Sequence, residues 1–393
     1  MKQQERKHLA CELSALSVFR GVLCTGPMAA LVRFLRSEDL LEQMDAYGTF
    51  VAGLAEDGYC FSDFLSRAVY EDENPYVTAV AAGKQVACVL LKNAEAELKL
   101  LSKLTELNPE ALCEDLQYCG YVPGFENRSI DLAAAYAQRL QQIDRYGYGV
   151  FASAAMFRVE ENKIVPVQTA DTVSVERFVG YEAERKQVFE NTQALVDGRP
   201  AANVLLFGDA GTGKSSTVKA CANFFYDQGV RLIELRKDQL FSLPLVMSRI
   251  AQNPLKFILF IDDLSFNKND DSFSMLKAAL EGSASAKAAN AVIYATSNRR
   301  HIVKEKFSDR GQSDDVHHGD TMQELLSLSD RFGLTVYFAK PNKQLYLEIV
   351  HTLAQKRGVE MEQTQLDIKA EAFALAKGTR SPRAAEQFIN SLL

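Results

Sequence analysis

The chain has 393 residues, more than one hydrophobic core usually organises, so its length predicts two or three domains. Hydrophobic residues make up 47% of the sequence and charged residues 24%, which excludes a largely disordered chain. The net charge of −7 excludes a global positive field that would drive non-specific binding to nucleic acids or membranes.

The cysteines and the first residues indicate the compartment. The cysteines are odd in number and form no C-x-x-C pair, so we expect buried, reduced thiols rather than a disulfide framework or a zinc site. They are Cys11, Cys24, Cys60, Cys88, Cys113, Cys119 and Cys221. Glu12 and Arg20 interrupt the apolar stretch near the start, and no apolar run reaches the length of a membrane span. We therefore expect a cytosolic protein that does not enter a membrane.

Apolar residues at three- and four-residue spacing predict helices over most of residues 5–144. In the last of these helices five such residues share one face, as in a helix that packs against a core. They are Ile130, Ala133, Tyr136, Leu140 and Ile143. Beyond Gly147 and Gly149, two short apolar runs flank the sequence Glu-Glu-Asn-Lys and predict a hairpin. We place a domain boundary near residue 170, so that residues 1–170 form a mostly helical N-terminal domain for selecting a partner or substrate.

Short apolar runs alternate with helical stretches from Asp171 onward. Continuous apolar runs are typical of strands in a parallel sheet that is covered on both faces. Five such runs occur, at residues 203–208, 230–235, 257–262, 291–296 and 334–339. Residues 171–340 therefore predict an α/β domain with a five-stranded parallel sheet flanked by helices. The last stretch, residues 341–393, returns to helices, one of them stopped by Gly358 and another capped by Ser381.

The first strand is followed by a phosphate-loop motif, G-x-x-x-x-G-K-[ST], at the start of the next helix. Glycines allow the backbone N–H groups to wrap closely around a phosphate, and the helix that begins at Lys214 adds the positive end of its dipole. Lys214 is expected to reach the β- and γ-phosphates of a nucleotide and the Ser215 hydroxyl to bind Mg²⁺. The predicted nucleotide-binding residues are Gly208, Asp209, Ala210, Gly211, Thr212, Gly213, Lys214, Ser215 and Ser216.

Two adjacent carboxylates end the strand at residues 257–262. A phosphate loop requires an acidic residue on a second strand, and we expect this strand to lie next to the loop strand. Asp262 is predicted to bind the magnesium ion through water. Asp263 is predicted to point toward the water that attacks the γ-phosphate. The alternative for Asp263 is a capping or solvated aspartate at a strand end.

Four further residues suit the charge that grows on phosphoryl oxygens in the transition state. Asn298 ends the fourth strand and is predicted to sense the γ-phosphate. Arg331 precedes the fifth strand, and Arg380 and Arg383 lie beside the final helix. The alternatives are an ordinary turn residue for Asn298 and solvated surface residues for the arginines.

In this order, the motifs closely resemble those of the AAA+ superfamily of ATPases over residues 171–393. The resemblance implies a P-loop AAA+ core, a C-terminal helical lid, and ATP with Mg²⁺ as ligands. It also implies that Arg331 is an arginine finger that reaches the γ-phosphate of a neighbouring subunit, and hence a homo-oligomer. Arg383, with Arg380 as the alternative, matches the second sensor in the lid.

A narrower resemblance is to the bacterial AAA-type ATP-binding family known as domain of unknown function 815. It is carried by the segments "FVGYEAERKQVFENTQALVDG", "GDAGTGKSS", "FIDDLSF", "LEGS", "YATSNRRH" and "SLSDRFGL". In the first of these, Val179 and Gly180 resemble the part of AAA+ proteins that supports the adenine. Many AAA+ members carry Asp-Glu where this chain has Asp262 and Asp263, and the shorter side chain of Asp263 predicts slow turnover.

Two polar segments near the site leave alternatives open. The basic cluster at residues 297–307 is either a nucleic-acid contact or a solvated loop, and acidic residues soon follow it. His317 and His318 are either metal ligands or exposed, unpaired side chains.

The leading hypothesis is an ATPase that hydrolyses ATP to ADP and phosphate, and whose lid and N-terminal domain move against an unknown protein client. The second is a nucleotide-gated binding module or loader, which hydrolyses ATP slowly or not at all and recruits a protein or nucleic-acid partner. A third, a small-molecule kinase, would transfer the phosphate to an acceptor, but the sensor and lid arginines fit the AAA+ reading better.

Overall fold

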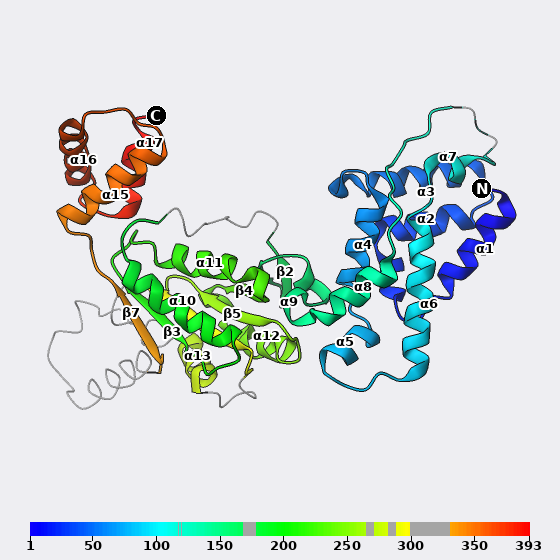
Figure 1. Ribbon diagram of the computed structural model, residues 1–393, viewed down its shortest axis with the longest axis horizontal. Coiled ribbons are helices and arrows are strands. Elements are labelled where there is room, and N and C mark those ends of the chain that lie inside the picture. The colour runs from blue at the N-terminus through cyan, green and yellow to red at the C-terminus, as the bar shows by residue number, and fades with distance from the viewer. Residues whose placement is uncertain (117, 119, 168–177, 265–270, 282–287, 299–330) are drawn as a thin grey trace. The chain divides into compact units, whose positions relative to one another are not determined.

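The computed structural model describes residues 1–116, 118, 120–167, 178–264, 271–281, 288–298 and 331–393. These residues form two compact units, 1–153 and 154–393 (Figure 1). The first unit is helical, whereas the second contains a sheet followed by a small group of helices. Each unit buries a hydrophobic core of its own.

The first unit is a bundle of short helices, as the apolar spacing predicts. Its helices are α1 (Gln3–Ser14), α2 (Gly26–Arg36), α3 (Leu40–Ala52), α4 (Phe61–Glu71), α5 (Pro75–Ala81), α6 (Cys88–Leu104), α7 (Pro109–Cys113), α8 (Leu132–Gln141) and α9 (Ile143–Tyr146). Aromatic rings fill the middle of the bundle, where Phe50 meets Phe61 and Phe125 edge-on at centroid distances of 5.1 and 5.3 Å. Edge-on contacts place the positive rim of one ring against the negative face of another, which favours this packing.

A buried carboxylate fixes the chain between α1 and α2. Glu97 of α6 is only 8% exposed and accepts hydrogen bonds from the backbone N–H groups of Ser17, Val18 and Phe19. These donors compensate the carboxylate for the water that it loses on burial. Glu97 therefore has a structural role in this unit.

A seven-stranded sheet organises the second unit, in the order β2-β1-β4-β5-β6-β3-β7. The strands are β1 (Met156–Glu160), β2 (Lys163–Pro166), β3 (Val204–Gly208), β4 (Val230–Leu235), β5 (Lys256–Ile261), β6 (Ala291–Ser297) and β7 (Leu334–Phe338). All neighbouring strands are parallel except β1 and β2, which form an antiparallel hairpin. The predicted α/β fold and its five parallel strands are thus confirmed as β3 to β7, and the hairpin adds two strands to the same sheet.

Two expectations about the sheet need correction. The hairpin pairs with β4, with Met156 opposite Leu232, so the boundary between the units lies after residue 153 rather than near residue 170. The acidic strand β5 does not lie next to the loop strand β3, because β6 pairs with both of them. Apolar runs identify strands, but they carry no information about which strands pair across the sheet.

Both faces of the central strands β3 to β6 are buried, which accounts for their continuous apolar runs. On one face Leu206 and Phe260 share a core with α10 (Glu182–Val196) and α11 (Lys214–Phe224). On the other face Leu205 and Leu259 are buried as well. The helices α12 (Leu243–Ile250) and α13 (Asp271–Glu281) follow β4 and β5 in the chain.

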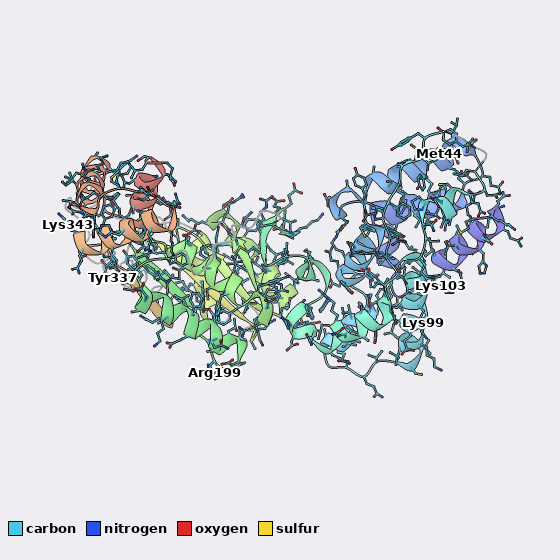
Figure 2. The ribbon with its side chains drawn as sticks, turned by 45° about the horizontal axis from the view of Figure 1, so that its top comes forward. Met44, Lys99, Lys103, Arg199, Tyr337 and Lys343 are labelled. Carbon is cyan, nitrogen blue, oxygen red and sulfur yellow. The ribbon has the colours of Figure 1, made fainter. Side chains whose placement is uncertain are left out.

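Three helices after the sheet form what we call the helical lid. They are α15 (Lys343–Lys356), α16 (Gln363–Lys377) and α17 (Pro382–Asn390), and they share a core. The lid follows strand β7, which carries the half-exposed Tyr337 (Figure 2). Ser381 caps α17 as predicted, since its Oγ accepts a hydrogen bond from the backbone N–H of Ala384 at 3.2 Å.

Two expectations about thiols and membranes can be compared with the structure. The described cysteines are free, as expected, but they are not all buried: Cys60 and Cys221 are buried, whereas Cys11, Cys24 and Cys88 are exposed. The spacing of cysteines excludes disulfide frameworks, but it does not determine burial. Within the described ranges, none of the helices combines the length and apolarity that crossing a membrane requires.

Gly208, the first glycine of the phosphate loop, lies where β3 meets β7. Its φ is +137°, which favours glycine, and an added Cβ would lie 2.0 Å from the carbonyl oxygen of Phe338. Gly213 in the same loop also has a positive φ, +92°, but an added Cβ would meet nothing within 4 Å. The loop therefore contains one glycine required by packing and another required only by its φ.

We expect Gly208→Ala to weaken the β3–β7 pairing by about 3 kcal/mol, because the unfavourable φ and the clash with Phe338 add to each other. Gly213→Ala is the matched control and should cost about 1 kcal/mol, since only its φ is unfavourable. Hydrogen exchange of the β3 and β7 amides measures both costs. Equal protection of these amides in the two variants would contradict the close approach.

Candidate functional site

The chain from Gly208 to Lys214 forms a tight loop between β3 and α11. Gly213 is the N-cap of α11, and its carbonyl accepts a hydrogen bond from Thr217 Oγ1 at 2.9 Å. Inside the loop, Thr212 Oγ1 donates to the carbonyl of Asp209 at 2.9 Å. The first backbone N–H groups of a helix have no partner within it, so this loop and helix end form an arrangement that binds anions.

Lys214 is buried at the base of this loop and is only 6% exposed. Its Nζ donates to the carbonyls of Gly208 and Asp209, at 2.9 and 2.7 Å, and to Asn298 Oδ1 at 3.1 Å. Burial lowers the pKa of Lys214 because the ammonium loses water, although nearby carboxylates oppose this shift. An anion at the loop would therefore be favourable, since it supplies the negative charge that best compensates a buried ammonium.

Asp262 connects the ends of three elements. Its Oδ1 accepts hydrogen bonds from Ser215 Oγ at 2.6 Å and from Thr296 Oγ1 at 2.5 Å. Asp262 follows β5, Ser215 lies in the first turn of α11 and Thr296 belongs to β6. The structure thus brings together Ser215 and Asp262, the two residues predicted as magnesium ligands.

The donor set at Asp262 fits a magnesium ion that arrives with a nucleotide. Hydroxyl and carboxylate oxygens are ligands that Mg²⁺ prefers, and Mg²⁺ commonly binds through one or two carboxylates together with substrate phosphates. In the part of the chain that the structure describes, no group of three or more His, Cys, Asp or Glu side chains is placed to hold a metal ion. Ser215 and Asp262 therefore suit a metal ion that the phosphates of a nucleotide also bind.

Asp263 and Asn298 face each other beside Lys214. Asn298 Nδ2 donates to Asp263 Oδ1 at 2.7 Å, while Asn298 Oδ1 accepts from Lys214. The backbone N–H of Asp263 donates to Thr296 Oγ1 at 2.9 Å, and its φ of +51° is uncommon for a residue other than glycine. This turn directs the Asp263 carboxylate toward the predicted sensor of the γ-phosphate.

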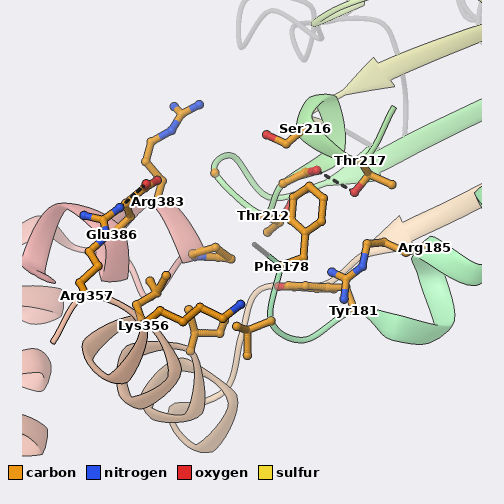
Figure 3. Close-up of a pocket in the computed structure, with 16 residues that line it drawn as sticks. Phe178, Tyr181, Arg185, Thr212, Ser216, Thr217, Lys356, Arg357, Arg383 and Glu386 are labelled. Atoms are coloured by element: carbon orange, nitrogen blue, oxygen red, sulfur yellow. Dashed lines mark hydrogen bonds and ion pairs between the residues drawn. The ribbon is translucent and has the colours of Figure 1, made fainter. Parts of the chain in front are cut away.

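A pocket of about 700 Å³ lies between the loop, residues 178–181 and the helical lid (Figure 3). Its volume falls within the range of small-molecule sites. Its loop side is lined by Gly211, Thr212, Gly213 and Ser216, and its apolar end by Phe178, Val179, Tyr181, Ile349 and Leu353. A ligand with a polar, anionic end and an apolar ring fits this division.

The two residues predicted to support an adenine have different positions. Val179 lines the pocket, whereas Gly180 is buried behind it. Gly180 has a φ of +75°, and an added Cβ would lie 2.7 Å from Leu345 Cδ1. Gly180 therefore lets this segment pack closely against α15 of the lid.

Tyr181 joins the pocket to the beginning of the lid. Its hydroxyl donates to the carbonyl of Ala339 at 2.6 Å, and its ring stacks on Phe338 at 5.3 Å. Burial raises the pKa of Tyr181 to about 12, so the hydroxyl keeps its proton and remains a donor at neutral pH. No motif marks this residue, but its position directly after Gly180 was a signal that could have found it.

The structure distinguishes the two candidate sensors of the lid. Arg380 forms a bidentate ion pair with Glu371, at 3.0 and 2.8 Å. Arg383 lines the pocket, and its backbone N–H donates to the carbonyl of Gly211 at 3.3 Å. Arg383 is therefore the lid arginine that lies next to the phosphate loop.

Arg331 lies at the opposite end of the sheet from the loop. Strand β7 runs parallel to β3, with Leu334 opposite Val204 and Phe338 opposite Gly208. The first and last residues of β7 are roughly 13 Å apart, and Arg331 precedes the strand by three more residues. The fold therefore does not bring Arg331 to the loop of its own chain.

Several side chains near the pocket have no motif in the sequence. Arg185 is 12% exposed, lies over the ring of Phe178 at 5.1 Å and pairs with Glu182 at 3.2 Å. Arg357 and Glu386 form an ion pair of 2.9 Å on the lid side of the pocket (Figure 3). The three-residue spacing of Arg383 and Glu386, which puts them on one face of a helix, could have identified Glu386.

Some predicted segments lie outside the described residues. They are the basic cluster beyond Asn298, at 299–307, the pair His317 and His318, and the last two residues of the "DDLSF" signature, Ser265 and Phe266.

Among known proteins, the chain matches one family model and is distantly similar to several solved structures. The family model described as protein of unknown function (DUF815) matches residues 151–393, more than half of the chain. No curated protein matches the sequence significantly. Similar solved structures include the RuvB Holliday junction branch migration motor of Thermotoga maritima, with 14% identity over 56% of this chain and 71% of that chain and a TM-score of 0.34.

Two further structures are of the replication initiator DnaA. One is bound to AMPPCP and single-stranded DNA, with 17% identity over 57% of this chain and 66% of that chain and a TM-score of 0.41. The other is AMPPCP-bound DnaA from Aquifex aeolicus, with 17% identity over 56% and 64% of the two chains and a TM-score of 0.39. At these low scores the likenesses support no argument about function.

We expect Tyr181→Phe to loosen the start of the lid by about 1 kcal/mol, because it keeps the ring stacking but removes the hydrogen bond to Ala339. Hydrogen exchange of the amides at 339–345 measures this change. Tyr337→Phe, on the exposed side of β7, is the control and should leave these amides unchanged. Identical exchange in the two variants would mean that the Tyr181 hydroxyl does not hold the lid.

Proposed function

The chain belongs to the DUF815 family of proteins of unknown function, and from this premise we propose that it binds ATP with Mg²⁺ and hydrolyses ATP to ADP and phosphate. The observation that carries the proposal is the hydrogen-bonded series Lys214, Asn298 and Asp263 at the phosphate loop. The Ser215–Asp262 pair lies beside it. An ammonium, an amide and two carboxylates that converge on a phosphate loop suit phosphoryl transfer to water.

Each member of the series has a role in that reaction. Lys214 exchanges the loop carbonyls for phosphate oxygens, which compensate its buried charge better than carbonyl dipoles do. Asn298 is within reach of both Lys214 and Asp263, so its amide donates to the terminal phosphate. Asp263 orients the attacking water and accepts its proton.

The remaining residues hold the ligand. Ser215 and Asp262 bind the magnesium ion of the nucleotide, and this ion supplies positive charge that stabilises the phosphoryl oxygens. Val179 and Tyr181, at the apolar end of the pocket, contact the adenine. Arg383 lies at the loop and donates to the phosphates from the lid, so that binding draws the lid toward the core.

We further propose that the protein acts as a homo-oligomer on a protein client. Arg331 is at the far end of the sheet from its own loop, so it can complete only the site of a neighbouring copy, as the AAA+ resemblance implies. Hydrolysis then moves the lid and the N-terminal unit against the client. The net charge of −7 makes a nucleic-acid partner the weaker alternative.

A second candidate function is a nucleotide-gated binding module that turns over slowly or not at all. It is favoured by Asp263, whose carboxylate is one methylene shorter than glutamate and already accepts a hydrogen bond from Asn298. A carboxylate that already accepts a hydrogen bond is a weaker base toward the attacking water. In this case the bound nucleotide, rather than its hydrolysis, selects the conformation that recruits a partner.

Lys214→Ala should weaken ATP binding by at least about 100-fold, because it removes charged hydrogen bonds to the phosphates. Lys219→Ala is the matched control, since Lys219 lies on the same helix but pairs with Glu234 at 3.5 Å outside the pocket. Titration calorimetry with ATP and Mg²⁺ measures both affinities. If the two variants bind ATP equally well, the loop is not the nucleotide site.

Asp263→Asn should bind ATP as the wild type does but release phosphate at least about 100 times more slowly, since an amide cannot accept the proton of water. Arg331→Ala alone should be similarly slow. A mixture of the two variants should regain activity, because a site with intact Asp263 then receives an intact Arg331 from its neighbour.

Phosphate release at several protein concentrations separates the two candidate functions. Wild-type protein that binds ATP but releases no phosphate at any concentration would exclude the hydrolase and favour the binding module. A mixture that regains no activity, from a wild type that is active, would contradict the shared site.

A further inference from the structure

We infer that Glu386 makes the pocket selective for ribonucleotides over deoxyribonucleotides, by accepting hydrogen bonds from the hydroxyl groups of the ribose. This inference rests on the proposed function, because it assumes that a nucleotide occupies the pocket. Among the described residues that line the pocket, Glu386 is the only carboxylate. A carboxylate repels phosphates, so its place in a phosphate-binding pocket calls for a compensating interaction.

The ion pair with Arg357 does not by itself account for this position. The two side chains are 56% and 30% exposed, for Glu386 and Arg357 respectively, and ion pairs with such exposure contribute little to stability. The pair offsets only part of the repulsion between Glu386 and an incoming phosphate, because both side chains remain in contact with water. The hydrogen bond from Arg357 uses Oε1, and Oε2 accepts none from the described residues, so the carboxylate keeps capacity for a ligand.

The direction of α17 places Glu386 where the sugar of a nucleotide would lie. The helix begins at the loop, since the backbone N–H of Arg383 donates to the carbonyl of Gly211. Glu386 follows three residues later on the same side of the helix, roughly 4.5 Å farther along its axis. With the phosphates at the loop, the next group of the ligand is the ribose, and the base continues toward Val179.

The hydroxyl groups of a ribose need an acceptor for their hydrogens. Among the described residues that line the pocket, the other charged side chains are Arg185, Lys356, Arg357 and Arg383, all of which only donate. Glu386 is therefore the charged side chain of the pocket that can accept hydrogen bonds from these hydroxyls. A deoxyribose leaves the carboxylate without that partner, and loss of a hydrogen bond to a charged group weakens binding by about tenfold or more.

The experiment compares the affinities of the full chain for ATP, 2′-deoxy-ATP and 3′-deoxy-ATP, each with Mg²⁺, by titration calorimetry. Wild-type protein should bind 2′-deoxy-ATP about tenfold more weakly than ATP, and 3′-deoxy-ATP measures whether the carboxylate also accepts from the 3′-hydroxyl. Glu386→Ala should bring the ratio of the affinities for ATP and 2′-deoxy-ATP close to one, mainly by weakening the binding of ATP. Glu386→Gln keeps one acceptor oxygen in the same shape and should give an intermediate ratio.

The control variant is Gln387→Ala, which changes the neighbouring exposed side chain of α17 outside the pocket and should keep the wild-type ratio. If Glu386 only held the lid together, Glu386→Ala would weaken ATP and the deoxynucleotides by the same factor, and the inference would fail. It would fail equally if wild-type protein bound all three nucleotides alike, although the proposed function would stand. Absence of any nucleotide binding would instead overturn the proposed function.

Discussion

The rest of the site depends on the carboxylate of Asp262. Strand β6 separates the acidic strand from the loop strand, so backbone pairing alone does not bring the acid to the phosphates. Two side-chain hydroxyls connect the acidic strand to its neighbours, because Ser215 and Thr296 both donate hydrogen bonds to Asp262 Oδ1. Because β5 and β6 already pair through their backbones, this oxygen atom fixes the first turn of α11 to the ends of both strands, beside Asp263 and Asn298.

The site also contains backbone strain in residues other than glycine. Tyr181 and Asp263 have φ values of +61° and +51°, a region that costs roughly 1–2 kcal/mol for an L-residue. Such conformations persist where the surroundings enforce them. For Asp263 the enforcing contact is the bond from its N–H to Thr296, and for Tyr181 it is the bond from its hydroxyl to Ala339.

The parts of the fold and site that could be predicted are those encoded in contiguous residues. The phosphate loop, the acidic strand end and the cap at Ser381 each need only local sequence and local backbone geometry. Strand order and the membership of the hairpin could not be predicted, because they depend on pairing between distant segments. Tyr181 and Glu386 escaped prediction because neither belongs to a motif. Tyr181 matters through its bond to Ala339 and Glu386 through its place in the pocket, and both depend on the folded chain.

The junction between the sheet and the lid is very short. Phe338, the last residue of β7, has its carbonyl against Gly208 of the phosphate loop, and the carbonyl of the next residue, Ala339, accepts a hydrogen bond from Tyr181. Two consecutive residues therefore contact the first glycine of the phosphate loop and the hydroxyl of Tyr181 just before the lid begins at Lys343. The lid is therefore attached next to both the phosphate loop and a residue that lines the apolar end of the pocket, so a ligand that filled the pocket would lie beside both attachments.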